Sequence, residues 1–114
     1  MKLVIFSFFI LGIVFISGCS PKQGQYDTFA QCLTEKGTVM YGTDWCPHCK
    51  DQKAMFGPSF EYIDYVNCDF NRERCVAAGV QGYPTWIIEG LSYPGTQQLT
   101  RLASLSGCTL TIDQ

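Results

Sequence analysis

Two cysteines that are three positions apart, Cys46 and Cys49, constrain this chain more than any other feature of its sequence. They follow a short apolar run, residues 38–41, and precede a segment without helix breakers, residues 50–56. This pattern predicts a strand, a tight turn and a helix, with Pro47 at the first helical position, where its missing N–H costs nothing. The two thiols are therefore expected at the beginning of a helix.

A cysteine at a helix start lies beside unpaired backbone N–H groups and the positive end of the helix dipole, and both favour its thiolate. Cys46 is predicted to hold this position, and the thiolate is the form that attacks disulfides. His48, the only histidine, adds a donor and, when protonated, a positive charge that would lower the thiol pKa further. A stabilised thiolate means a less stable Cys46–Cys49 disulfide, which predicts an oxidant.

Other interpretations of these residues stay open. Cys46 and Cys49 could form a structural disulfide or half of a zinc site, although zinc needs a second close ligand pair that the other cysteines do not supply. We therefore predict no metal site. His48 could also be a surface residue of the turn or, as a lesser alternative, a metal ligand.

The N-terminal segment, residues 1–18, predicts a signal helix. Residues 3–16 are almost wholly apolar, but a helix of that length covers about 21 Å, less than the roughly 30 Å hydrocarbon core of a bilayer. Residues 16–19 resemble the lipobox of prokaryotic lipoproteins, which implies cleavage before Cys19 and a lipid on that cysteine. An uncleaved membrane anchor and an ordinary cleaved signal are the alternatives, and all three place the protein outside the cytoplasm.

Without this signal, roughly 100 residues remain, enough for one small domain. We expect a signal peptide over 1–18, a tether over 19–25 and a single domain over 26–114. Of seven cysteines, six remain once Cys19 is set aside, an even number suited to an oxidising compartment. The net charge is −2, and without a basic cluster nothing predicts binding to nucleic acid.

Apolar spacing and turn residues predict eight elements in the domain. In chain order they are a helix that Asp27 caps and Gly37 ends, a strand at 38–41, a helix from 47 to 56, a strand at 60–67, a helix at 71–78 capped by Asn71, a strand at 80–88, a short edge strand at 91–93 and a final helix capped by Thr96.

This order, with a Trp-Cys-Pro-His-Cys sequence after the first strand and Tyr-Pro-Thr entering the third, resembles the thioredoxin fold over essentially the whole domain. The resemblance implies an α/β fold with a four-stranded mixed sheet flanked by helices. More narrowly, the chain resembles the thioredoxin-like domain that is fused to, or works beside, bacterial vitamin K epoxide reductase homologues. The segments that carry this likeness are 29–33, 40–42, 45–50, 52–53, 56–57, 65–68 and 83–86. The Cys-Pro-His-Cys tetrapeptide is also that of DsbA-type oxidants.

The resemblance implies that Cys46 attacks, that Cys49 resolves, and that Pro84 is a cis proline facing the pair, a trans proline being the alternative. The implied catalytic positions are Cys46, Pro47, His48 and Cys49, and the implied substrate-binding positions are Trp45, Tyr83 and Pro84. The chain departs from the pattern at Met40, where thioredoxins and DsbA-type proteins carry a buried acid. It also lacks the helices of a membrane reductase, so such a partner would be a separate chain.

The four other cysteines of the domain are expected to be structural. Cys68 and Cys75 flank a six-residue loop, whose closure by a disulfide would stabilise the domain by roughly 2–3 kcal/mol. A second redox-active pair is the alternative. Cys32 and Cys108 are paired only by elimination, because spacing does not determine connectivity.

Together these features predict a membrane-tethered thiol–disulfide oxidoreductase of the cell envelope, facing the periplasm or the exterior. It would donate a disulfide to reduced secreted proteins, need no cofactor, and be reoxidised by a membrane partner such as a vitamin K epoxide reductase homologue. One alternative is a tethered reductase or isomerase like those of cytochrome c maturation. The other is a non-catalytic module whose thiols hold copper or zinc.

Overall fold

The computed structural model of the protein describes residues 12–14, 18 and 23–114. Cys19, the predicted lipidation site, lies outside the described residues, as do most positions of the predicted signal peptide and tether. Within the described ranges, none of the helices has both the length and the apolar character needed to cross a bilayer.

The described helices and strands all fall within the predicted domain. In chain order they are α1 (Asp27–Glu35), β1 (Val39–Gly42), α2 (Pro47–Phe56), the 3-10 helix η1 (Gly57–Tyr62), β2 (Asp64–Asn67), α3 (Arg72–Ala77), β3 (Thr85–Ile88), β4 (Leu91–Pro94) and α4 (Leu99–Ser106).

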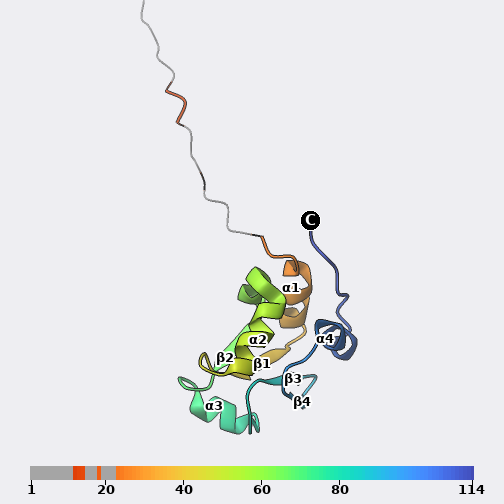
Figure 1. Ribbon diagram of the computed structural model, residues 1–114. Helices are drawn as coiled ribbons and strands as arrows, with labels where there is room; N and C mark the ends of the chain where they lie inside the picture. Colours follow the sequence, from red (N-terminus) through yellow and green to blue (C-terminus); the bar gives the residue numbers. More distant parts are fainter. Residues whose placement is uncertain (1–11, 15–17, 19–22) are drawn as a thin grey trace, which may run out of the picture.

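The four strands form one sheet in the order β2-β1-β3-β4. β1 is parallel to β2 and antiparallel to β3, and β4 is antiparallel to β3. Figure 1 shows helices on both sides of this sheet. The predicted mixed four-stranded sheet is therefore confirmed, and the arrangement fits an α/β thioredoxin-like fold.

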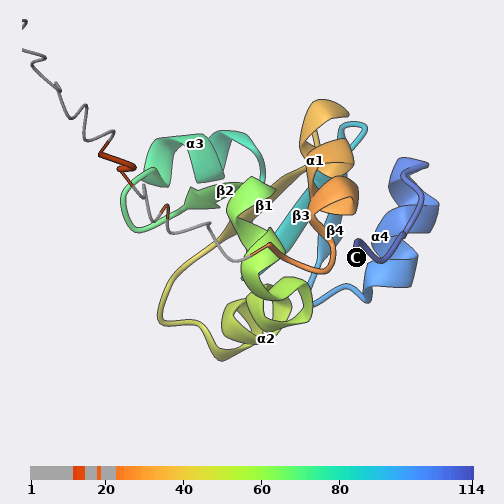
Figure 2. The ribbon, with the colours of Figure 1, turned by 90° about the horizontal axis from the view of Figure 1, so that it is seen from above.

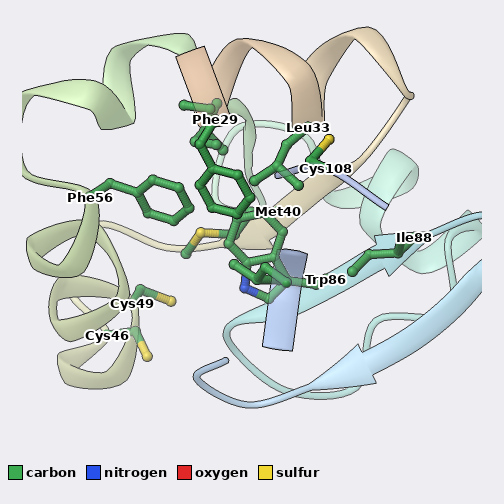
Figure 3. Close-up of a cluster of buried hydrophobic side chains, with 12 residues drawn as sticks. Phe29, Leu33, Met40, Cys46, Cys49, Phe56, Trp86, Ile88 and Cys108 are labelled. Atoms are coloured by element: carbon green, nitrogen blue, oxygen red, sulfur yellow. The ribbon is translucent and has the colours of Figure 1, made fainter. Parts of the chain in front are cut away.

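Alternate residues of the central strands point to opposite faces of the sheet, as the pleat requires. On one face, Met40 of β1 and Trp86 of β3 pack with buried side chains of α1, α2 and α4; Figure 3 shows this core. On the other face, Tyr41 of β1 packs with Val66 of β2 and Cys75 of α3. The larger core thus lies on the face that carries α2, the helix that begins after Cys46.

A buried glutamine fixes α2 against the sheet. The Gln52 Oε1 atom accepts hydrogen bonds from Trp86 Nε1 at 3.0 Å and from the Gln97 backbone N–H at 2.7 Å, and its Nε2 donates to the Gln97 carbonyl at 2.9 Å. Because Gln52 is fully buried, these bonds replace the water that its amide would otherwise bind. They join the middle of α2 to β3 and to the segment that precedes α4.

Two disulfides cross-link segments of the domain, and they join the cysteine pairs that the sequence analysis expected. Cys32 of α1 is bonded to Cys108, just after α4, and Cys68 is bonded to Cys75 of α3. Figure 2 shows the C-terminal segment beside the start of α1, where the backbone N–H of Asp113 donates to the Gln25 carbonyl at 2.8 Å.

Two predicted strands are shorter in the structure. The predicted strand at 60–67 begins only at Asp64, because Pro58 and the residues after it form η1, in which Phe60 packs edge-on against both Phe56 and Tyr65. The predicted strand at 80–88 begins only at Thr85, whose hydroxyl donates to the Gly82 carbonyl at 2.8 Å and closes a turn before β3.

The predicted helix cap at Asp27 is wrong, and the predicted cap at Asn71 is confirmed in its position but not in its side-chain hydrogen bond. Asp27 is the first residue of α1, and its carboxylate accepts a hydrogen bond from the preceding Gly24 N–H at 3.1 Å. Asn71 does occupy the N-cap of α3, but its side chain donates to the Asn67 carbonyl at 2.9 Å and accepts no bond from the helix.

The predicted cap at Thr96 is also wrong, because α4 begins at Leu99 with Gln98 as its N-cap. The Thr96 hydroxyl donates instead to the His48 carbonyl on α2 at 3.3 Å. In each of these helices the predicted capping side chain bonds a group outside its own first turn.

Candidate functional site

The thiol pair, Cys46 and Cys49, lies at the start of α2. Cys46 is the N-cap residue, with extended backbone angles, and Pro47 is the first helical residue, as predicted. The Lys50 N–H donates to the Cys46 carbonyl at 3.0 Å and closes the first helical turn. Both cysteines are free thiols, and Figure 3 shows their sulfur atoms on the same side of α2.

The segment before β3 lies against Cys46. The Tyr83–Pro84 peptide bond is cis, and the Cys46 thiol contacts the Tyr83 carbonyl oxygen at 3.6 Å. Pro84 is buried, whereas Tyr83 is partly exposed. The fold therefore brings together the cysteine and the proline segment that lie far apart in the sequence.

Trp45 forms an exposed rim next to the thiol pair. Its ring meets the Tyr83 ring edge-on, with 6.2 Å between the centroids, and its Nε1 donates to Asp69 Oδ2 at 3.0 Å. With 62% of its surface exposed, Trp45 presents a large apolar face to solvent close to Cys46.

The surroundings of the two thiols push their pKa values apart. Burial raises the pKa of Cys46, but it is outweighed by hydrogen bonds from the backbone N–H and thiol of Cys49 and from the backbone N–H of His48. The pKa of Cys46 therefore lies below its usual value. Burial raises the pKa of Cys49 to about 11, against the opposing hydrogen bond from the Thr43 backbone. Cys46 is therefore the better nucleophile at neutral pH.

His48 contributes to this difference through its backbone. The residue is exposed, and none of the hydrogen bonds among residues 23–114 involves its imidazole. The sequence analysis expected the imidazole to stabilise the Cys46 thiolate, and that role stays a prediction.

Gly42, the last residue of β1, permits the close approach of Cys49 to the sheet. A Cβ at this position would lie 2.7 Å from Cys49 Sγ and 3.5 Å from a ring carbon of Tyr65. Real Cβ atoms do not tolerate the shorter distance. The sequence analysis did not identify this residue, although a glycine ending the strand before a Cys-x-x-Cys motif was a signal that could have been used.

A polar cluster of Asp44, Lys53, Tyr65 and Asn67 lies beside the thiol pair and was also missed. The Asp44 carboxylate accepts hydrogen bonds from Lys53 Nζ, the Tyr65 hydroxyl and Asn67 Nδ2, each at 3.0 Å. The bond from Lys53, followed by that from Tyr65, holds the pKa of Asp44 below its usual value. Asp44 therefore stays ionised at neutral pH.

Comparison with known proteins shows that the chain is similar to a protein named for thiol–disulfide exchange. The chain is 36% identical over 90 residues to the protein named "Thiol-disulfide oxidoreductase LTO1" from Arabidopsis thaliana. The match covers 71% of this chain but only 24% of that relative, so the chain spans about a quarter of its length. No protein-family model matches the chain.

Proposed function

We propose that the protein is a thiol–disulfide oxidoreductase that uses Cys46 as its nucleophile. The observation that carries this proposal is the inequality of the two thiols, because backbone N–H groups lower the pKa of Cys46 while burial raises that of Cys49. The likeness to a relative named for this activity supports it, as does the cis Pro84 segment against Cys46.

In the proposed reaction, the oxidised protein carries a Cys46–Cys49 disulfide. A substrate thiolate attacks Cys46 Sγ, the Cys46–Cys49 bond breaks, and Cys49 leaves with the electron pair and takes up a proton. A second substrate thiolate then attacks the substrate sulfur of this mixed disulfide and releases Cys46 as a thiolate. The substrate loses two electrons, and the protein gains them as a dithiol.

Substrate segments would bind along the rim beside Cys46. Trp45 and Tyr83 offer partly exposed rings, and the backbone next to Pro84 can align an extended chain. Pro47 starts the helix directly after Cys46. Reduced secreted proteins, whose unfolded segments expose both apolar side chains and free thiols, fit such a surface.

The proposed setting is the cell envelope, with the protein anchored through a lipid on Cys19. The lipobox-like residues 16–19 support the anchor, and the disulfides Cys32–Cys108 and Cys68–Cys75 support an oxidising compartment. A separate membrane protein, such as a vitamin K epoxide reductase homologue, would reoxidise the thiol pair. No cofactor takes part in the exchange.

Trapping of partners tests the role of Cys46. In Cys49→Ser, the Cys46 thiolate attacks a partner disulfide, and the mixed disulfide accumulates because the internal thiol that reverses it is absent. Cys46→Ser is the matched control and should trap nothing. Equal trapping by both variants would show that Cys46 is not the nucleophile.

The reduction potential tests the direction of electron flow. Stabilising the Cys46 thiolate raises the potential, so we expect a value above the approximately −270 mV of thioredoxin. A value at or below it would favour the alternative function, a tethered reductase or isomerase. His48→Leu, measured in parallel, should lower the potential if the imidazole adds to the effect of the backbone.

A further inference from the structure

The buried thiol of the pair poses an electrostatic problem in the proposed reaction. Cys49 has no exposed surface, yet it must carry a negative charge whenever the Cys46–Cys49 bond opens or closes. Met40, on the adjacent strand β1, is also fully buried and can neither hold a charge nor exchange a proton. The hydrogen bond from the Thr43 backbone offsets this burial only in part, because the pKa of Cys49 is still raised to about 11. A nearby positive charge would stabilise the thiolate further.

Lys53 lies in a suitable place for this. It follows Cys49 by one turn of α2, and helical side chains lean back toward the N-terminus, so its ammonium is directed toward the turn of Cys49. Lys53 Nζ lies 4.1 Å from the centroid of the Tyr65 ring. That ring in turn borders Gly42, against which Cys49 Sγ packs.

The ammonium is held in place and partly shielded from water. Asp44 Oδ1 is 3.0 Å from Lys53 Nζ, and the side chain of Lys53 is 27% exposed against 66% for Asp44. The Tyr65 ring and, at 5.6 Å, the Phe60 ring cover the ammonium on the protein side. A charge that is partly removed from solvent acts more strongly on its neighbours.

Apart from the hydrogen bond from the Thr43 backbone, the other groups near Cys49 do not compensate its charge. Burial and the hydrogen bond to Asp44 raise the pKa of Tyr65 above its usual value, so this phenol stays neutral. Asp44 is an anion and cannot stabilise a second one. Cys46, in the same turn, itself carries negative charge when free, and raises the pKa of Cys49. From the strands, Met40 and Trp86 of the same core contribute no charge.

We propose that Lys53 stabilises the Cys49 thiolate each time the Cys46–Cys49 bond opens or closes, and that Asp44 is the positioning residue that holds its ammonium. The proposal rests on the proposed function for its role in the reaction. When a substrate thiolate breaks the bond, the departing Cys49 sulfur forms beside the ammonium and then takes a proton from water. When the bond closes, Cys49 gives its proton to water and its thiolate attacks Cys46 Sγ in a mixed disulfide, which breaks the bond between Cys46 and the partner and releases the partner sulfur as a thiolate.

Direct titration of Cys49 tests the proposal without any substrate. In a Cys46→Ala background, which leaves Cys49 as the only free thiol of the domain, the ¹³Cβ chemical shift of Cys49 is followed against pH. Lys53→Met should raise the pKa of Cys49 by about half a unit or more, as expected for loss of one nearby charge. Lys53→Arg keeps the charge and should restore most of the original value.

Lys50→Met is the matched control. It removes the same charge from the same helix, but Lys50 is exposed, and none of the hydrogen bonds and ion pairs of Asp44 in the described part of the chain involves it. Its effect should be clearly smaller than that of Lys53→Met. Backbone chemical shifts establish that each variant is folded at the pH of the titration. In a Lys53→Met protein that keeps Cys46, the rate at which the Cys46–Cys49 disulfide closes at neutral pH should fall about threefold, because the thiolate fraction of Cys49 falls by that factor.

An unchanged pKa in folded Lys53→Met, or an equal shift in Lys50→Met, would overturn the proposal. These outcomes are separate from the fate of the proposed function, which depends on trapping through Cys46. If Cys49→Ser traps partners but Lys53→Met leaves the pKa of Cys49 unchanged, the proposed oxidoreductase function stands and the role of Lys53 does not. If Lys53→Met raises the pKa of Cys49 but no partner is trapped through Cys46, Lys53 does stabilise the Cys49 thiolate, and the proposed oxidoreductase function is wrong.

Discussion

Replacing Gly42 by alanine should destabilise the reduced protein. The added Cβ would lie 2.7 Å from Cys49 Sγ, about 0.7 Å inside the limit of ordinary contact, and Cys49 is enclosed by the core. Forcing an additional carbon into a packed site costs about 1–3 kcal/mol. Alanine also reduces the conformational entropy of the unfolded chain, and this effect alone would stabilise the folded protein by about 0.4–1 kcal/mol. The net expectation is a loss of about 1.3 kcal/mol in the free energy of unfolding, within a range of about 0–2.6 kcal/mol.

Gly82→Ala is the matched control for this loss. Gly82 is exposed, has no atom within 4 Å of an added Cβ, and does not have a positive φ. Only the restriction of the unfolded chain remains there, so this variant should be unchanged or slightly more stable. The assay is urea unfolding, with the thiol pair reduced and the two structural disulfides intact. If Gly42→Ala is as stable as Gly82→Ala, then Cys49 does not pack against Gly42 as described.

Two further predictions concern α2 and its N-cap residue. Gln52→Ala should lower the free energy of unfolding by about 2–5 kcal/mol, because it leaves two buried N–H groups without an acceptor. Urea unfolding measures this loss. The control is Gln31→Ala, at an exposed position, which should lower the free energy of unfolding by less than about 0.5 kcal/mol. With iodoacetamide at pH 7, Cys46 should be alkylated at least about tenfold faster than Cys49 by mass spectrometry, because only its pKa lies below the usual value. Equal rates would contradict the assignment of unequal thiols.

Local rules were enough to predict the start of α2. Proline at the first helical position and a preceding N-cap cysteine depend on neighbours in the sequence, and Pro47 and Cys46 hold the predicted positions. The strand β1 and the two structural disulfides also agree with the sequence analysis. For the disulfides, the small number of remaining cysteines left few alternatives.

The parts that could not be predicted depend on contacts between distant segments. Thr96 has the residue type of a helix cap, but its hydroxyl bonds the His48 carbonyl, 48 positions away. The bond that joins Gln52 to Trp86 is equally invisible in the sequence. Lys53 looks like an ordinary solvated residue of a helix until the fold brings Asp44 to its ammonium.

The inequality of the two thiols follows from where each lies in the helix. Cys46, as N-cap, has its sulfur next to backbone N–H groups that have no helical acceptor, and these stabilise negative charge. Cys49 lies one turn further on, on the side of α2 that packs against the sheet at Gly42, where burial penalises the same charge. In the proposed reaction the backbone therefore determines which of the two sulfurs, Cys46 rather than Cys49, exchanges with the substrate. Substitutions at His48 should adjust the potential of the pair without exchanging the roles of its two cysteines.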